Sequence, residues 1–410
     1  MPPRSIIALN HMTRFQCLGG SCEDTCCQTW GVTIDEKHYK TLSRLMKDDA
    51  QFNATFVKKP PAERTRDGFA VIQMGADDRC PLLSQDLLCT LHAKHGEPAL
   101  PDICSSYPRF VNEIGGRLEL SGSMSCPEVV RQSLLVDDGV ELVQADAALI
   151  GRAPVVQRPS GGDAQLVDEI RGTMVALLGF SQYPLDSRLF FLTSLAQAAE
   201  PHVAPGKADY RALSAVTDQF LTIPVLDGLH QSYRANIAPS LHADRTLLGQ
   251  LGGIFAVARP ALGADIERVI DSYVAEGALL KSEEGVSVTE QFHAAWATRR
   301  AALLPSLEAS LDRATHHFAV TYCMRQLYLR KASLSLHVIE LLLRLATWRF
   351  LLLSDSATFA TEAAFHARLV QVIYQLARVV DHSPDTQATL LAPVPAGLPT
   401  LGAVAGLLLF

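Results

Sequence analysis

Cysteine is the residue type whose placement in this chain points most directly to chemistry. Eight of the nine cysteines lie within the first 126 residues. An even spread would place roughly three of them there. The eight are Cys17, Cys22, Cys26, Cys27, Cys80, Cys89, Cys104 and Cys126. The ninth, Cys323, falls in a helical pattern, where we expect a small core residue. The cluster predicts either disulfides or a metal site.

The cellular compartment decides between these two, because cytosolic thiols are kept reduced. The N-terminal sequence MPPRSIIALNHMTRF has no apolar core long enough for an export signal, so we expect a cytoplasmic protein. We therefore expect the eight cysteines to bind metal.

The spacing of the thiols bears on which metal they bind. The cluster begins C-x4-C-x3-C-C and continues with four widely separated cysteines. Structural zinc usually takes paired short knuckles, whereas thiolates from several loops are common ligands of iron–sulfur clusters. The pattern favours a 4Fe-4S cluster, with zinc as the alternative. His92 is a candidate ligand of a mixed zinc site, but we expect it to be an exposed helical residue. Adjacent Cys26 and Cys27 point in different directions on most backbones, so we expect that they do not share one metal atom. Whether there are one or two sites stays open.

Short strands and turns are expected around the cysteines. Phe69 to Met74 has a strand-like composition, and residues 109–114 and 117–121 flank Gly115-Gly116 as in a β-hairpin. Pro127 then opens a helix at a favoured first-turn position. Residues 1–147 are therefore predicted to be an α+β, cysteine-rich metal-cluster domain.

The rest of the chain is predicted to be helical, so the fold class is mainly α. Residues 148–164 are rich in Gly, Pro and Ser and predict a linker. Apolar residues then recur at helical spacing through a domain at 165–388. The expected helices cover 166–180, 188–200, 210–221, 244–257, 266–280, 289–303, 311–328, 334–353 and 362–380.

Two apolar stretches are candidate membrane spans. Leu336 to Leu353 contains Glu340, Arg344 and Arg349, which indicates a buried helix of a soluble protein. The tail at 389–410 carries no charge but contains three prolines, leaving too few residues for the roughly 20 that span a bilayer. We expect no membrane span, and a tail packed on the protein or on a partner.

Charge and motifs exclude several functions. The net charge of -7 argues against nucleic acid as the main partner, because phosphate binding needs a basic patch. No G-x-G-x-x-G motif is present, so a Rossmann-type methyltransferase domain is unsupported. Hydrolase motifs such as H-E-x-x-H are also absent. Composition and motifs alone indicate a cysteine-ligated metalloprotein with a helical domain.

Three segments resemble the flagellin lysine-N-methylase family in order and spacing. They are FQCLGGSCEDTCCQTWGVTID (15–35), RCPLLSQDLLCTLHAKHGEPALPDICSSYPRF (79–110) and LELSGSMSCPEVV (118–130). The same blocks resemble, more loosely, a wider cysteine-cluster family associated with zinc or iron. The resemblance covers about a third of the chain, residues 10 to 135.

The resemblance implies methyl transfer from S-adenosylmethionine to lysine side chains of flagellin in the cytoplasm. Such transfer needs a group that deprotonates the lysine ammonium, whose ordinary pKa is about 10.4. Asp35, Tyr107 and Glu128 are the candidate catalytic residues in the matched blocks, and Glu119 is a further carboxylate there. Each has a structural alternative as a helix cap, turn residue or ion-pair partner.

Two more residues are candidates for contacting the cosubstrate. Arg109 is placed to bind the methionine carboxylate, or to form an internal salt bridge. Trp30 is placed to face the sulfonium, or to pack in the core. The implied cluster is structural or anchors the cosubstrate, since the C-x3-C-x2-C of radical enzymes is missing.

A second class of function stays open beside the enzyme. The chain also fits a non-enzymatic iron- or zinc-binding module with a helical partner-binding domain. Vicinal Cys26 and Cys27 additionally allow a reversible redox dithiol. The sequence leaves the oligomeric state undecided.

Overall fold

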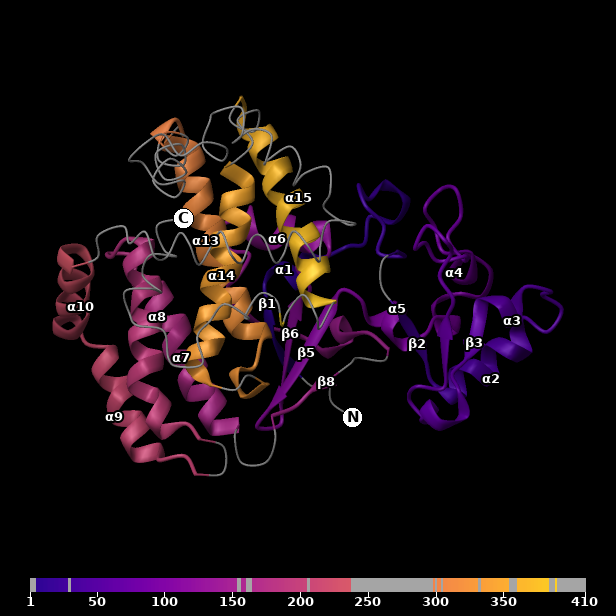
Figure 1. Ribbon diagram of the computed structural model, residues 1–410, viewed down its shortest axis with the longest axis horizontal. Coiled ribbons are helices and arrows are strands. Elements are labelled where there is room, and N and C mark those ends of the chain that lie inside the picture. Colours follow the sequence, from indigo (N-terminus) through magenta and orange to yellow (C-terminus); the bar gives the residue numbers. More distant parts are fainter. Residues whose placement is uncertain are drawn as a thin grey trace, which may run out of the picture. The chain divides into compact units, whose positions relative to one another are not determined.

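The computed structural model describes residues 5–28, 31–152, 156–159, 164–204, 207–236, 298, 301–303, 305–330, 333–353, 360–382 and 388. The chain divides into two compact units (Figure 1). The cysteine-rich unit comprises Met1–Glu113, Arg117–Gln132 and Glu141–Gln157. The helical unit comprises Ile114–Gly116, Ser133–Val140 and Arg158–Phe410.

One of two sheets in the cysteine-rich unit has five strands, in the order β7-β1-β6-β5-β8. Strand β1 lies between β7 and β6 and pairs in parallel with β6 and antiparallel with β7. Met12 of α1 and Val129 of α6 are buried in the core of this sheet. The elements are β1 (Ser5–Leu9), α1 (His11–Arg14), β5 (Arg109–Ile114), β6 (Arg117–Gly122), α6 (Pro127–Leu134), β7 (Leu142–Asp146) and β8 (Val156–Gln157).

The predicted hairpin is confirmed as β5 and β6, which are neighbours in this sheet. Gly115 and Gly116 form its turn with φ angles of 56° and 80°, a conformation that glycine adopts without a steric penalty. The helix predicted to open at Pro127 is likewise confirmed as α6.

The second sheet has three antiparallel strands, in the order β2-β4-β3. The strand predicted over Phe69 to Met74 is present in its shorter form as β4. Phe56, Leu42 and Leu91 are among the residues of its separate core. The elements around it are β2 (Val32–Ile34), α2 (Glu36–Leu45), α3 (Phe52–Thr55), β3 (Phe56–Lys58), β4 (Ala70–Ile72), α4 (Thr90–His95) and α5 (Asp102–Ser106).

The segment predicted as a linker contains a strand. Val156 lies in β8 and pairs in parallel beside Val111 of β5. A β-branched valine suits such an edge position, although Gly and Pro dominate the surrounding composition. The cysteine-rich unit therefore extends to Gln157.

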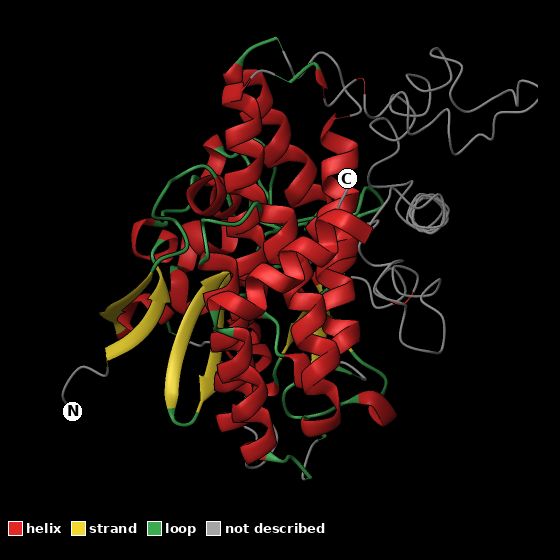
Figure 2. Cartoon of the chain, turned by 90° about the vertical axis from the view of Figure 1, so that its left-hand side faces the viewer, coloured by secondary structure: helices red, strands yellow, loops and turns green. Residues whose placement is uncertain are grey.

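The helical unit is built from long helices, and Figure 2 shows how far helix predominates in the chain. Six of the predicted helices are present with bounds close to those expected. The helix α10 was not expected, because Pro224 and Gly228 weaken the helical pattern. The predicted helices at 244–257 and 266–280, nearly all of 289–303, and the tail at 389–410 lie outside the described residues. The helices are α7 (Ala164–Gly179), α8 (Leu185–Ala199), α9 (Tyr210–Phe220), α10 (Ile223–Asn236), α13 (Pro305–Arg325), α14 (Leu334–Leu353) and α15 (Glu362–Asp381).

The apolar stretch at 336–353 lies within α14 and is a buried helix, as predicted. Two of its charged residues are paired inside the unit: Arg344 donates to Glu340 and also to Asp381, both at 2.7 Å. Arg325 pairs with the same Asp381 at 2.7 Å. None of the described helices combines the length and apolarity that crossing a lipid bilayer requires.

Candidate metal centre

The eight clustered cysteines are free thiols. We group them into two sets of four by the sheet core against which members pack and by the cysteines that shift one another's pKa, and a hydrogen bond between Cys26 and Cys27 joins the two sets. The Cys27 group consists of Cys27, Cys80, Cys89 and Cys104. The Cys126 group consists of Cys17, Cys22, Cys26 and Cys126.

Two loops and the helix α5 carry the cysteines of the Cys27 group. The amide of Cys80 donates to the carbonyl of Cys27 at 2.9 Å, which joins the first loop to the second. An isolated bridge between Leu83 and Cys89 closes the second loop on itself. Cys80, Cys89 and Cys104 all pack against the core of the three-stranded sheet. Packing alone therefore gathers these thiols.

Without a cation, the buried thiols of Cys80, Cys89 and Cys104 are held in their neutral, protonated form. Burial raises the pKa of Cys80 to about 11, and the thiolates of Cys27 and Cys89 contribute to the rise. Burial also raises the pKa of Cys104, with added repulsion from the other three thiolates. Backbone amides after Cys80 and Cys89 donate to their sulfurs and partly offset this effect. A bound metal would remove the repulsion, because the thiolate is the form that binds metal.

The Cys126 group is assembled around the N-terminus of α6. Cys126 is buried beside Met12 and Val129 in the core of the five-stranded sheet. The guanidinium of Arg131 pairs with Glu128 of the same helix and with Glu23. Because Glu23 directly follows Cys22, this ion pair holds the Cys22 loop against the helix that Cys126 precedes.

The electrostatics of the Cys126 group resemble those of the first. Burial raises the pKa of Cys126 to about 11, and the thiolates of Cys22 and Cys17 contribute to the rise. Amides of Glu128 and Val129 donate to the Cys126 sulfur and oppose the rise. The pKa of Cys26 is raised chiefly by its hydrogen bond to Cys27, then by burial, with Cys17 and Cys126 also acting on it.

Adjacent Cys26 and Cys27 belong to different groups in the structure. Their side chains are hydrogen-bonded to each other, which lowers the pKa of Cys27 to about 7 despite its burial. His92 is exposed on α4, and its backbone amide rather than its ring contacts Cys89. Cys323 is buried in α13, as expected for a core residue.

Residues 16–122 match a family model described as “Putative zinc- or iron-chelating domain”. The chain is also 31% identical over 136 residues to the flagellar biosynthetic protein FliU of Salmonella muenchen, a match that covers 32% of this chain and 78% of FliU. The chain belongs to the FliU family. The lysine-N-methylases of Salmonella typhimurium and Salmonella choleraesuis are 31% and 30% identical to it over 136 residues.

The matches to the lysine-N-methylases cover only part of each chain. They cover 32% of this chain but only 33% of each lysine-N-methylase. No solved structure matches the chain. Cys126 lies just beyond the residues that the chelating-domain model matches, so this FliU-family chain completes its second thiol group outside that domain.

Four of the candidate residues lie in or beside the five-stranded sheet, namely Tyr107, Arg109, Glu119 and Glu128. The hydroxyl of Tyr107 is hydrogen-bonded to that of Ser125 at 3.1 Å. Glu128 accepts hydrogen bonds from Arg131 and Gln132. These contacts give Tyr107 and Glu128 structural roles, whatever else they do.

Arg109, expected near the cosubstrate, donates from Nε to the carbonyl of Leu149 at 2.7 Å. Its guanidinium carbon lies 6.0 Å from the centroid of the Phe15 ring. Glu119 forms an ion pair with Arg117 at 2.6 Å. Trp30, the other cosubstrate candidate, lies outside the described residues.

Asp35 has a different setting, at the N-terminus of α2. Its carboxylate accepts from the amide of His38 and contacts the His38 Nδ1, each at 2.9 Å. Burial opposes ionisation, but these hydrogen bonds outweigh it and lower the pKa of Asp35. Asp35 is therefore a helix cap, which is one of the structural roles expected from the sequence. It also lines a pocket.

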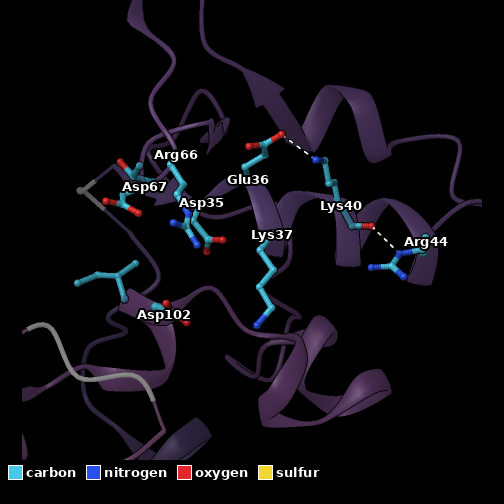
Figure 3. Close-up of a pocket in the computed structure, with 10 residues that line it drawn as sticks. Asp35, Glu36, Lys37, Lys40, Arg44, Arg66, Asp67 and Asp102 are labelled. Carbon is cyan, nitrogen blue, oxygen red and sulfur yellow. Dashed lines mark hydrogen bonds and ion pairs between the residues drawn. The ribbon is translucent and has the colours of Figure 1, made fainter.

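The pocket has a volume of about 750 Å³ and is walled by charged side chains (Figure 3). Apart from Asp35, sequence reasoning missed it. The available signal was basic residues at 37, 40 and 44, whose helical spacing places them on one face of the helix after Asp35. The lining residues are Thr33, Asp35, Glu36, Lys37, Lys40, Arg44, Arg66, Asp67, Asp102 and Ile103.

Proposed function

We propose that this protein is a lysine N-methyltransferase that methylates flagellin, with S-adenosylmethionine as donor and two cysteine-ligated metal centres. The observation that carries the proposal is the match of the cysteine-rich part to proteins named Lysine-N-methylase. The flagellin substrate is supported by the similarity to FliU, a flagellar biosynthetic protein. The donor and the substrate follow from the family resemblance.

The residues present fit a metal centre in each thiol group. Each group offers four sulfurs, the ligand number of both a four-cysteine zinc site and a 4Fe-4S cluster. Backbone amides already donate to sulfurs of Cys80, Cys89 and Cys126, as is common where protein donors tune a thiolate-ligated metal. Bound metal would supply positive charge and fix the loops that carry the thiols.

The spacing of the sulfurs supports iron–sulfur clusters over zinc. Among the described residues, no three of the thiol sulfurs lie within 4.8 Å of one another. Four sulfurs around one zinc ion stand roughly 3.8 Å apart, given Zn–S bonds of about 2.3 Å. A wider set suits ligands that bind different iron atoms of one cluster. We therefore propose a 4Fe-4S cluster in each group.

Methyl transfer also needs the protein to orient a lysine, which must lose its proton. A neutral amine must attack the sulfonium methyl in line. Of the three candidate catalytic residues, Asp35 is the one that lines the pocket, and its lowered pKa keeps it ionised at neutral pH. We propose that Asp35 attracts and orients the lysine ammonium. Because this contact stabilises the protonated lysine, the proton passes to bulk water before the neutral amine attacks, and Tyr107 and Glu128 support the fold around Cys126.

The direct test is label transfer by the full chain, purified without oxygen and loaded with iron and sulfide. Methyl-labelled S-adenosylmethionine and the flagellin of the same organism serve as substrates, and mass spectrometry locates the modified lysines. The wild type and the matched variant Cys323→Ser should label flagellin, whereas Cys104→Ser should not. Metal-loaded wild type that leaves flagellin unlabelled would contradict the proposal.

A non-enzymatic metal-binding module is the second candidate function. It is favoured by one observation: the matches cover only the cysteine-rich third of the chain. This alternative predicts metal loading without affinity for S-adenosylmethionine. Tight, stoichiometric binding of that cosubstrate in a calorimetric titration would exclude it.

A further inference from the structure

The pocket beside α2 is polarised between two walls. Lys37, Lys40 and Arg44 stand on one side of it in Figure 3, and Asp35 and the other aspartates stand on the opposite side. The basic wall comes from one face of α2, and the acidic wall is completed from two separate segments by Asp67 and Asp102. Arg66 stands beside the aspartates and Glu36 beside Lys40, so a ligand that spans the pocket meets mainly cations at one end and mainly carboxylates at the other.

Some of these charges are already paired within the protein. Lys40 pairs with Glu36 at 2.8 Å. The Nδ1 atom of His38 lies 2.9 Å from Asp35 and 3.5 Å from Asp102. Arg152 adds a cation 3.6 Å from Asp102.

Other charges on the walls are available to a ligand. Within the described part of the chain, Lys37, Arg44 and Arg66 form no ion pair with a carboxylate, and Asp67 forms none with a cation. Arg44 uses its Nε for the carbonyl of Lys40 at 3.2 Å, which fixes its side chain along the helix. The pocket therefore holds uncompensated groups of both signs.

The size and charge of the pocket define a ligand class. A volume of about 750 Å³ is in the range of cofactor sites, typically about 300–1,000 Å³. We infer that this pocket binds the amino-acid end of the methyl donor, with Arg44 and Lys37 on its carboxylate and Asp67 on its ammonium. The inference rests on the proposed function for the identity of the donor. It assigns the donor to residues other than Arg109 and Trp30.

The pocket is also linked to the metal centre through α5. Asp102 and Ile103 line the pocket, and the next residue of the same helix, Cys104, belongs to the Cys27 group. Metal bound by Cys104 would fix this helix and with it one wall of the pocket. Donor binding should therefore weaken when the metal is removed.

The test is a calorimetric titration of the metal-loaded full chain with S-adenosylhomocysteine, which keeps both the carboxylate and the ammonium. Arg44→Gln and Asp67→Asn should each weaken binding by about 10-fold or more, since each removes a charge-assisted hydrogen bond. Lys47→Gln and Asp48→Asn are the matched controls, because neither residue lines the pocket. The controls should bind as the wild type does. 5′-Methylthioadenosine, which lacks the amino-acid end, should bind all five proteins equally.

Equal affinity of S-adenosylhomocysteine for the pocket variants and the wild type would overturn the inference, as would no binding to the wild type. Flagellin labelling separates this failure from failure of the proposed function. If the pocket variants bind and methylate normally, the pocket assignment is wrong and the enzyme stands. If binding depends on Arg44 and Asp67 but flagellin stays unlabelled, the pocket stands and the substrate assignment is wrong.

Discussion

The two units of this protein bury very different groups. The helical unit has helices of up to 21 residues and a core that includes fully buried Trp348 and Phe191. The cysteine-rich unit has strands of two to six residues and two separate small cores. Small cores contribute little to stability, and proteins with such cores often rely on metal ligation. We therefore propose that metal binding and folding are coupled in the cysteine-rich unit and not in the helical unit.

The units also differ in how they treat buried charge. In the helical unit, Asp381 is neutralised by Arg325 and Arg344, so its pKa lies well below the usual range. In the cysteine-rich unit, Cys80, Cys104 and Cys126 are buried beside other cysteines and their pKa values rise, so these thiols stay neutral without a cation. The first arrangement is a charged network complete within the protein, whereas the second becomes charged when a bound metal displaces the thiol protons.

Removal of metal should therefore have the largest effect, and it should fall on one unit. Chelation under anaerobic conditions should abolish most amide protection at 17–27 and 80–126, because lost ligation is lost folding free energy. Amides of α14 should keep their protection. Hydrogen exchange followed by mass spectrometry measures both regions in one sample. Equal loss of protection in both units would contradict the proposal that the helical unit folds independently of metal.

Breaking the buried ion pairs of the helical unit should give the converse result. Asp381→Asn removes the carboxylate partner of buried Arg325 and leaves Arg344 with Glu340 alone, and it should destabilise the helical unit by about 3–5 kcal/mol. Metal content should not change. Asp218→Asn, an exposed position in α9, is the matched control and should have little effect. Hydrogen exchange of α14 and α15, with metal analysis, provides the measurement.

The same carboxylate predicts a pH dependence. Because the folded-state pKa of Asp381 is lowered from 3.8, its contribution is fully present above about pH 4 and is lost as the pH falls through the lower folded value. The difference in α14 protection between wild type and Asp381→Asn should therefore be constant from pH 7 to 5 and shrink in stronger acid. A difference that grows on acidification would contradict this sign.

A smaller effect is expected where the two thiol groups share a close contact. A Cβ atom at Gly20 would lie 2.5 Å from the carbonyl oxygen of Asp86, which packs the Cys17–Cys22 loop on the Cys80–Cys89 loop. Gly20→Ala should destabilise the cysteine-rich unit by about 1–3 kcal/mol, as overpacking does. Gly31→Ala is the control, since its Cβ would meet nothing within 4 Å. Equal thermal midpoints for the two variants would show that the close contact between Gly20 and Asp86 does not stabilise the cysteine-rich unit.

The smallest effect is predicted for the exposed ion pair beside the Cys126 group. Glu23→Gln removes one partner of Arg131 and should destabilise the Cys22 loop by about 0.2–1 kcal/mol, less at high salt. Metal release to a chelator should be slightly faster than in Glu63→Gln, which changes an exposed glutamate with no ion pair among the described residues. Identical rates of metal release at low salt would show that the Glu23–Arg131 ion pair does not stabilise the Cys22 loop.

Local features were readable from the sequence, because they depend on neighbouring residues. Gly115-Gly116 specified the hairpin, and the apolar period specified α14 with its bounds at Leu334 and Leu353. The cysteine count predicted a metal site. The helix α10 escaped notice because Pro224 lies in its first turn, where proline is tolerated but weakens the pattern.

Features made by distant segments were not readable. Cys126 joins Cys17, and Asp102 joins Asp35, only because separate sheets and loops bring them together. Spacing along the chain carries no information on such meetings. Hence the division of the thiols into two groups, and the charged pocket, came from the structure.

The most direct test of the account is metal analysis of protein purified without oxygen, for the wild type, Cys104→Ser, Cys126→Ser and Cys323→Ser. The account predicts two 4Fe-4S clusters, about eight irons per chain, in the wild type and in Cys323→Ser. It predicts one cluster in each of the other two variants. A single centre that both Cys104→Ser and Cys126→Ser abolish, or full metal content in either variant, would contradict the two four-thiol sites.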